Sequence, residues 1–275
     1  MIPNLRCKHS KELGITITGA SGYVGLHLIE AFGSGDFRDV PIEHVPAGSV
    51  IIHLAAAVSD TRDALLANLA ADTLLLEIAN DRHRRIIYAS SNNIYPCAIG
   101  CRLNELPDCS DYYAASKIFG ETLYSNLSKI PVTAVRIADV FGIGQKHGKF
   151  FNAIEKSIRT HTPLRQYGKG LKRRSYIHIQ ELCAFLMFAA QDGFMDSQAH
   201  AKINLGYRDS AGVSEILSLV SELTDLPIRV TQLEADASAF DVRTMQATEV
   251  SGYTLRWASF RDALKAYVEQ IVSDR

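Results

Sequence analysis

Tyr113 and Lys117, four residues apart, are the pair in this sequence best placed for acid–base chemistry. On a helix this spacing puts both side chains on one face. A tyrosine phenol, with a pKa of about 10, is a poor base at neutral pH. A neighbouring ammonium favours the phenolate and lowers that pKa. The pair therefore predicts a tyrosine that exchanges a proton with a substrate hydroxyl or carbonyl.

Ser91 is the third residue of this predicted chemistry. It follows an apolar run at residues 85–90 that predicts a strand, and ligands of open α/β sheets bind at the carboxyl ends of strands. A hydroxyl there would hydrogen-bond the same substrate oxygen. Taken alone, Tyr113 and Lys117 are better explained as a surface helix pair, so the catalytic interpretation needs a nucleotide site as well.

A glycine-rich turn near the start of the chain predicts that site. Gly19, Gly22 and Gly25 stand between an apolar run at residues 14–19 and a helical pattern. In this context the glycines permit a tight turn, a close approach to a pyrophosphate and close helix–strand packing. The helix N-terminus then offers free amides to the phosphates. With the serine, tyrosine and lysine in this order, the pattern predicts hydride transfer to or from a bound nicotinamide.

The segment after the glycine turn is short. Only 27 residues separate Gly25 from His53, and a helix and a strand of average length take about fifteen of them. Two further strand–helix units do not fit, so the adenosine side of the predicted site is reduced. Asp36 and Asp39 are candidates for a ribose-binding carboxylate, whereas Arg38 would suit a 2′-phosphate. The choice between NAD and NADP stays open.

The elements that position these residues alternate along the chain. Predicted strands are residues 14–19, 49–54, 85–90 and 132–137, with helices after the glycine turn and at 63–79 and 113–127. This order indicates an α/β fold, a Rossmann-like doubly wound parallel sheet. We predict that residues 1–142 form mainly the NAD(P)-binding domain. Residues 143–275 form mainly a small mixed α/β C-terminal substrate lobe, with segments that return to the main sheet.

Composition excludes several classes of function. A net charge of -1 gives no reason to expect nucleic acid or an anionic membrane as a partner, and we expect the arginines near residue 84 to be a solvated helix end. The longest apolar run, residues 182–190, is too short for a bilayer, which needs about 20 residues. Five cysteines without zinc spacing predict free thiols, no metal and a cytoplasmic location.

At this point the chain resembles the extended short-chain dehydrogenase/reductase family. Within it, the similarity is to the NAD-dependent epimerase/dehydratase group, which acts mainly on nucleotide sugars. The resemblance runs from about residue 14 to residue 272 and rests on eight motifs in the family's order. They are Gly19-Ala-Ser-Gly-Tyr-Val-Gly25, His53-Leu-Ala-Ala56, Tyr88-Ala-Ser-Ser-Asn-Asn-Ile-Tyr-Pro96, Tyr113-Ala-Ala-Ser-Lys117, Arg136-Ile-Ala-Asp-Val-Phe-Gly142, Arg174-Ser-Tyr-Ile-His178, Ile203-Asn-Leu-Gly206 and Leu255-Arg-Trp257.

The resemblance implies a set of site residues. Ser91, Tyr113 and Lys117 would be catalytic, with Tyr113 and Lys117 also touching the cofactor. Further cofactor contacts would come from Gly19, Gly22, Tyr23, Val24, Gly25, Leu54, Ala55, Ala56 and Asn68. Asp36-Phe-Arg-Asp39 looks like the family's segment beside the adenine, with Asp36 and Phe37 as cofactor contacts. The strand before them, with its usual ribose-binding acid, would then be deleted.

Departures from the family's pattern narrow the expected reaction. Family dehydratases carry an Asp-Glu pair where this chain has Asn92 and Asn93, so we do not expect dehydration. The sequence around Asn93 is similar to that of the family's sugar reductases and epimerase-reductases. There the position of Asn93, a candidate substrate contact, can hold a proton-handling cysteine. His147 is a possible replacement acid, although a solvated loop residue is the favoured interpretation.

Two further candidate substrate residues give opposite signals. Arg174 stands where the family binds the substrate's phosphates, a role that suits a guanidinium. Asp139 stands where nucleotide-sugar enzymes usually carry an asparagine, and a carboxylate would repel a diphosphate unless it is paired. We expect an NAD- or NADP-dependent 4-keto reductase or epimerase of a nucleotide sugar. A reductase of a non-nucleotide carbonyl and a non-catalytic cofactor-binding regulator remain alternatives. The resemblance also implies a homodimer through helices 63–79 and 113–127.

Overall fold

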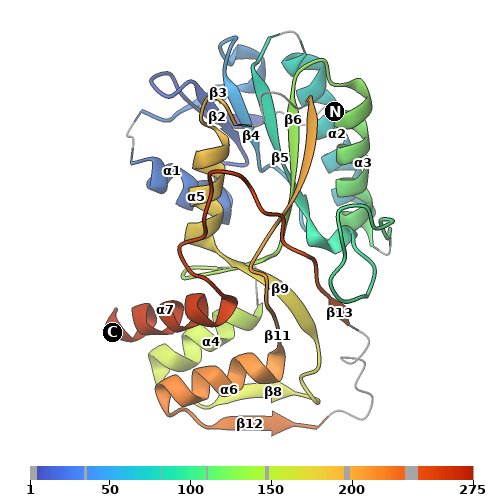
Figure 1. Ribbon diagram of the computed structural model, residues 1–275. Helices are drawn as coiled ribbons and strands as arrows, with labels where there is room; N and C mark the ends of the chain where they lie inside the picture. The colour runs from blue at the N-terminus through green and yellow to red at the C-terminus, as the bar shows by residue number, and fades with distance from the viewer. Residues whose placement is uncertain are drawn as a thin grey trace. The chain divides into compact units, whose positions relative to one another are not determined.

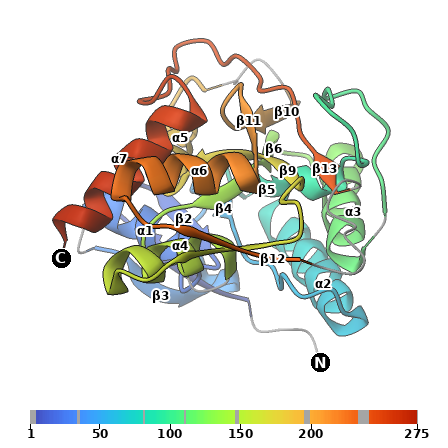
Figure 2. The same ribbon diagram turned by 90° about the horizontal axis from the view of Figure 1, so that it is seen from below.

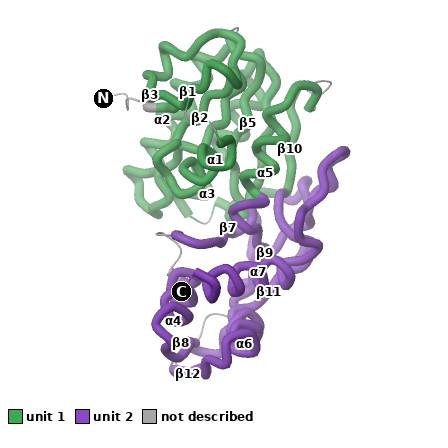
Figure 3. Tube along the Cα trace, turned by 90° about the vertical axis from the view of Figure 1, so that its left-hand side faces the viewer, with its two compact units in different colours: residues 1–94, 106–137, 182–204 green, residues 95–105, 138–181, 205–275 purple. Residues whose placement is uncertain are grey.

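The chain folds into two compact units, which are described separately. The computed structural model describes residues 5–33, 36–80, 82–109, 111–145, 149–194, 199–232 and 241–274. Unit 1 comprises residues 1–94, 106–137 and 182–204, and unit 2 comprises residues 95–105, 138–181 and 205–275 (Figure 3). Each unit therefore consists of several separate segments of the chain.

Unit 1 is built on a seven-stranded sheet. Its strand order is β10-β6-β5-β4-β2-β1-β3. The strands are β1 (Arg6–Ser10), β2 (Ile15–Thr18), β3 (Arg38–Pro41), β4 (Val50–His53), β5 (Arg85–Ser91), β6 (Val132–Ile137) and β10 (His200–Leu205). β2, β4, β5 and β6 pair in parallel, and every residue of β2, β4 and β5 is buried. Such continuously buried strands suit a sheet covered on both faces, and the predicted α/β fold is confirmed.

Helices cover the two faces of this sheet. α2 (Arg62–Ala79) and α3 (Tyr112–Leu127) lie side by side on one face, and α1 (Tyr23–Phe32) and α5 (Ile179–Ala189) lie on the other (Figures 1 and 2). Each of α2 and α3 begins at a side-chain cap. Thr61 accepts a hydrogen bond from Ala64 N, and Asp111 accepts one from Ala114 N at 2.6 Å. These caps fix where α3 starts, and so where Tyr113 and Lys117 lie.

The sheet edge beside β2 differs from the usual doubly wound order. β1 pairs antiparallel with β2 on one side and with β3 on the other, in the place where a second parallel strand normally lies. Between α1 and β4 the described residues hold one strand, β3, and a short turn at Ile42–His44. The shortened segment is thus confirmed. The strand β1, which pairs in its place, was not predicted from the sequence.

The arginine cluster near residue 84 is not simply a solvated helix end. Arg85 is buried, and its guanidinium donates to the carbonyl oxygens of Gln191 and Phe194, which follow α5. Arg84 forms an ion pair with Asp192 at the surface. The expectation was therefore wrong for Arg85, which is buried and binds carbonyl oxygens of the segment after α5.

Unit 2 combines short strands with three helices. β7 (Asp139–Phe141), β9 (Arg173–His178), β11 (Ser210–Gly212) and β13 (Val242–Arg243) form one sheet, and β8 (Leu164–Tyr167) pairs with β12 (Ile228–Thr231). The helices are α4 (Lys149–Thr160), α6 (Val213–Thr224) and α7 (Phe260–Ser273). Aromatic rings of Phe141, Phe151, Tyr176, Phe260 and Tyr267 form its core. In neither unit does a described helix have the length and apolarity needed to cross a membrane.

Candidate active site

The glycine turn brings β2 against the loop that follows β4. Gly19 has a φ of 67°, and a Cβ on it would lie 2.6 Å from Ala55 N. A Cβ on Gly25 would lie 2.6 Å from Ala20 Cα. Both positions therefore exclude any larger residue. α1 has Gly22 as its N-cap and no side-chain cap, which suits a helix N-terminus that binds a phosphate.

Replacing Gly19 with alanine should lower the free energy of unfolding by about 3 kcal/mol, through backbone strain and overpacking. Urea unfolding followed by circular dichroism measures this loss. Gly33→Ala is the matched control, because Gly33 has a φ of 64° but no atom within 4 Å of its Cβ position. It should cost only about 1 kcal/mol. Equal losses in both variants would show that the contact with Ala55 is unimportant.

Asn68 of α2 fixes the loop after β4. Its Oδ1 accepts from Ala57 N at 2.8 Å, and its Nδ2 donates to Ala57 O at 3.0 Å and to Ser116 Oγ at 3.1 Å. Both hydrogens of the amide are therefore used inside the protein. The side chain ties Ala57, which directly follows residues 54–56, to Ser116 of α3, between Tyr113 and Lys117. Asn68 thus holds the loop beside the predicted cofactor site, and its direct contact with the cofactor stays a prediction.

Lys117 anchors α3 to the carboxyl end of β5. Its Nζ donates to Ala89 O at 2.7 Å and lies 5.7 Å from the centroid of the Tyr113 ring. The Lys117 side chain is buried, whereas Tyr113 is partly exposed. Burial lowers the pKa of Lys117, and the carboxylates of Asp72 and Glu121 oppose this shift. An ammonium thus lies beneath a tyrosine ring, at the edge of the sheet where ligands bind.

The two neighbouring serines at the end of β5 have different partners. Ser90 Oγ donates to Glu121 Oε1 at 2.6 Å inside the sheet–helix interface. Ser91 Oγ accepts from Asn93 N at 3.1 Å, at the last residue of the strand. Ser90 is therefore committed to the core. Ser91 stands at the carboxyl edge, two residues beyond the carbonyl that holds Lys117, as expected for a residue that orients substrate.

The structure does not bring Asp36 and Phe37 to this edge. In the register of the hairpin, Ser10 lies opposite Ile15 at the amino end of β2, and Asp36 accepts from Ser10 Oγ at 3.2 Å. The ring of Phe37 is buried 5.7 Å from that of Phe32. The assignment of these two residues to the adenine site is therefore corrected. β3 runs toward the glycine turn, so the residues before it start at the opposite edge.

The candidate substrate residues lie in both units. Asn93 is in a short turn after β5 in unit 1. In unit 2, the Arg174 guanidinium donates to Asp241 Oδ1 and to Asp241 O at 2.7 Å, while Asp139 Oδ2 lies 3.9 Å from Arg174 Nε. Asp139 thus lies beside a cation, which offsets the repulsion of a diphosphate expected from its charge. His147 lies outside the described residues.

Two acidic residues of these networks were not predicted from the sequence. Asp72 of α2 is buried beside His53 and Tyr88, and Asp241 contacts Arg174 and Lys172. A signal for Asp72 existed, since it follows Asn68 by four residues and so shares its helix face. Asp241 is 67 residues from Arg174, and no spacing rule connects them. The contact of Asp241 with Arg174 could be found only in the structure.

Comparison with known proteins gives one family and several relatives. A family model described as "NAD dependent epimerase/dehydratase family" matches residues 36–206. A curated relative from Bacillus cytotoxicus, UDP-N-acetyl-alpha-D-glucosaminuronate decarboxylase, is 24% identical over 261 residues, which cover 76% of this chain and 79% of the relative.

Solved structures share the fold over almost the whole chain. MoeE5 in complex with UDP-glucuronic acid and NAD is 25% identical with a TM-score of 0.75, covering 95% of this chain and 99% of that one. RMD from Pseudomonas aeruginosa, complexed with NADPH, is 18% identical with a TM-score of 0.74, covering 94% and 98%.

Proposed function

The chain belongs to the NAD dependent epimerase/dehydratase family, and from this membership we propose that it is an NAD(P)-dependent enzyme acting on a nucleotide sugar. The proposed reaction is 4-keto reduction, or epimerisation through a 4-keto intermediate. The observation that carries the proposal is the buried Lys117 ammonium, held by Ala89 O beneath the Tyr113 ring at the carboxyl edge of the sheet. The nucleotide-sugar ligands and substrates named for the relatives support the choice of substrate.

The carboxyl edge of unit 1 fits a nicotinamide dinucleotide. Gly19 and Gly25 allow the close backbone packing of a dinucleotide-binding turn, and the uncapped start of α1 suits a pyrophosphate. Lys117 would hold the nicotinamide ribose, while Leu54, Ala55 and Ala56 would line the site. When bound, the nicotinamide would accept or donate the hydride. NAD and NADP both remain open, since the relatives include complexes with NAD and with NADPH.

Three side chains of unit 1 would carry the proton transfer. Tyr113 takes the proton from the substrate hydroxyl as the carbonyl forms, and returns a proton to that oxygen when the carbonyl is reduced. The Lys117 ammonium favours the phenolate through its charge. Ser91 hydrogen-bonds the reacting oxygen and keeps it within reach of Tyr113. Asn92 and Asn93 cannot serve as an acid and a base, so the proposal excludes water elimination.

Unit 2 would bind the nucleotide. It contains a cavity of about 520 Å³, lined in part by the aromatic rings of Phe150 and Tyr167 and by the cations Lys156 and Arg165. Aromatic rings suit a base, and the cations suit an anion. Arg174 would bind the diphosphate, with Asp139 nearby to orient the guanidinium. Asp241 would have to yield part of its contact with Arg174 when the substrate arrives.

Arg174→Lys should raise the KM for the nucleotide sugar about tenfold or more while leaving kcat nearly unchanged, because an ammonium cannot form the bidentate contact. Steady-state kinetics measure both constants. Arg173→Lys is the control, since the Arg173 guanidinium bonds Ser210 O and Glu215 within the protein. An unchanged KM for Arg174→Lys would remove Arg174 from the substrate site.

A non-nucleotide carbonyl substrate is the second candidate. The pairing of Arg174 with Asp241 and Asp139 favours it, since two carboxylates already meet that guanidinium. Purified protein should be offered UDP-, GDP-, CDP- and dTDP-sugars with each cofactor. Conversion at C4 of one of them supports the main proposal. Reduction of simple carbonyls alone, insensitive to added nucleoside diphosphates, would support the second.

We also propose that the enzyme is a cytoplasmic homodimer that pairs through α2 and α3. Leu66 on α2 and Leu127 on α3 are more than half exposed, at 51% and 61%. Exposed leucines on adjacent helices are suited to an interface. The cytoplasmic location continues the prediction from the free cysteines and rests on the sequence.

A further inference from the structure

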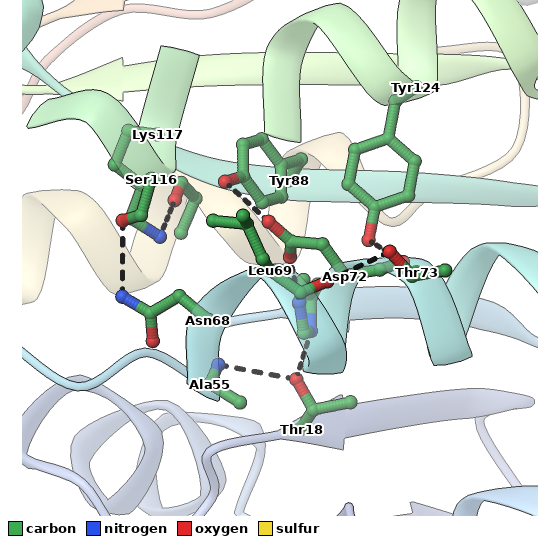
Figure 4. Close-up of polar contacts among 12 residues, drawn as sticks. Thr18, Ala55, Asn68, Leu69, Asp72, Thr73, Tyr88, Ser116, Lys117 and Tyr124 are labelled. Carbon is green, nitrogen blue, oxygen red and sulfur yellow. Dashed lines mark hydrogen bonds and ion pairs between the residues drawn. The ribbon is translucent and has the colours of Figure 1, made fainter. Parts of the chain in front are cut away.

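Asp72 of α2 is a buried carboxylate with partners on the sheet. It is 3% exposed. Its Oδ1 lies 2.8 Å from His53 Nε2 on β4, and its Oδ2 accepts from Tyr88 Oη on β5 at 3.2 Å. Figure 4 shows the contacts of Asp72 and Tyr88 beside Lys117. A carboxylate accepts and does not donate, so both contacts suit the anionic form.

His53 connects Asp72 to β2. Its Nε2 lies 2.8 Å from Asp72 Oδ1 and its Nδ1 lies 2.6 Å from Thr18 Oγ1, a hydroxyl that also accepts from Ala55 N at 3.3 Å. These contacts fix where the Asp72 carboxylate lies.

The other carboxylate near Lys117 is already neutralised. Glu121, on the same helix, accepts from Arg136 Nε at 2.9 Å and from Arg136 Nη2 at 2.8 Å, and Lys202 Nζ lies 3.3 Å from its Oε2. Two cations thus meet one carboxylate. Asp72 lies against His53, Tyr88 and Tyr124, and among the described residues no lysine or arginine forms an ion pair with it, so its charge is left to act on Lys117.

Tyr88 lies between Asp72 and Lys117. Lys117 Nζ is 4.9 Å from the centroid of the Tyr88 ring, and the hydroxyl of the same ring bonds Asp72. Gly120, one turn after Lys117, shows how closely α3 approaches: a Cβ there would overlap the Tyr88 hydroxyl and lie 2.6 Å from Asp72 Oδ2. The carboxylate, the ring and the ammonium are therefore buried together between α2, α3 and β5.

We infer that Asp72 is a positioning residue for the proposed reaction. Its carboxylate, held by His53 and Tyr88, is the counter-charge that keeps the buried Lys117 an ammonium beneath Tyr113. The inference rests on the proposed function, because that function assigns Lys117 its role beside Tyr113. The effect of the Asp72 charge on Lys117 can be measured without turnover. The charged and titratable groups around Lys117 are Asp72 on α2, His53 on β4, Tyr88 on β5, Tyr113, Glu121 and Tyr124 on α3, Arg136 on β6 and Lys202 on β10.

Stability measured against pH tests the charge relation without cofactor or substrate. Burial lowers the pKa of Lys117, so the folded protein is penalised below that pKa and the penalty fades as pH rises toward the ordinary value of 10.5. Asp72→Asn lowers this pKa further. The stability gap between the variant and the wild type should therefore be widest at pH 7 and should narrow toward pH 9.5, below the ordinary pKa of tyrosine.

Urea midpoints at several pH values measure this gap. Asp63→Asn, an exposed substitution on the same helix, is the control, and any gap it gives should be the same from pH 7 to pH 9.5. A gap for Asp72→Asn that is the same at every pH would mean a merely structural role and would overturn the inference. If Asp72→Asn does not fold, the double variant with Lys117→Met should restore folding, because it removes the unpaired ammonium. Failure of that rescue would also overturn it.

The pH profile of turnover provides the functional test. In Asp72→Asn the alkaline limb of kcat should move to lower pH by about one unit, because Lys117 loses its proton sooner. An unmoved limb together with a pH-dependent stability gap would separate the two hypotheses: Asp72 would set the charge of Lys117, but Lys117 would not have the proposed task. A protein inactive on every nucleotide sugar would contradict the proposed function, and the stability test would still decide the role of Asp72.

Discussion

Tyr113→Phe should lower kcat by about 10²–10⁴-fold, the range that a single acid–base group contributes. The phenyl ring keeps the packing over Lys117, whose Nζ lies 5.7 Å from the ring centroid, and loses only the hydroxyl. We therefore expect cofactor affinity and the unfolding midpoint to change little. Initial rates on the active nucleotide sugar, with calorimetric cofactor titration of the same preparation, measure both effects.

The neighbouring tyrosine provides a matched control for this substitution. Tyr112 is 47% exposed at the first residue of α3, so Tyr112→Phe removes a hydroxyl of the same kind, one residue from Tyr113. It should retain the wild-type rate. Retained activity in Tyr113→Phe, with both variants folded, would show that another group carries the proton.

Glu121→Gln should be the most destabilising of the single substitutions considered, at about 3–5 kcal/mol. Its carboxylate is 4% exposed and receives two hydrogen bonds from Arg136, one from Ser90 and an ion pair from Lys202. The neutral amide would leave the buried Arg136 without its counter-charge. Urea unfolding measures the loss. Glu222→Gln is the control, because Glu222 pairs with Arg261 on the exposed surface and its loss should be negligible.

The same ion pair predicts how stability depends on acid pH. Burial alone would raise the pKa of Glu121, but the hydrogen bonds and charge of Arg136 outweigh it and hold the pKa below the ordinary value of 4.5. A carboxyl whose folded pKa is lowered stabilises the protein above its unfolded pKa. That stability is lost as the pH falls below about 4.5 and passes through the folded pKa. The Glu121→Gln variant should lose less stability than the wild type over this range, and equal losses would contradict the assignment.

Periodicity predicted the elements of the sheet core because each one is uniform. The run at residues 49–54 is mostly apolar, and β4 occupies Val50–His53. The helix predicted at residues 63–79 is α2, Arg62–Ala79. β1 gave no such signal, because it includes Lys8 and His9. Its place depends on antiparallel pairing with one strand on each side, β2 and β3. Mixed polarity of this kind is typical of an edge region and is indistinguishable from a loop in sequence.

The candidate site, too, could be predicted only in part from the sequence. The order of Ser91, Tyr113 and Lys117 followed from motifs, and α3 and β5 place Lys117 at the carboxyl edge. Asp36 was misplaced because its position depends on the register of β1 and β3, which pair through backbone groups that every residue carries. The partners of Lys117 across the helix–sheet interface could not be predicted either, because contacts between α2 and β5 have no fixed spacing along the chain.

Calorimetric titration with NAD, NADH, NADP and NADPH, each alone and then with UDP, GDP, CDP or dTDP, tests the proposed nucleotide-sugar enzyme most directly. We predict micromolar binding of at least one cofactor, and binding of at least one nucleoside diphosphate to the complex. That result would identify the substrate class. If neither the cofactors nor the diphosphates bind, alone or together, the shortened adenosine side has disabled the site, and a non-catalytic role would replace the proposed reaction.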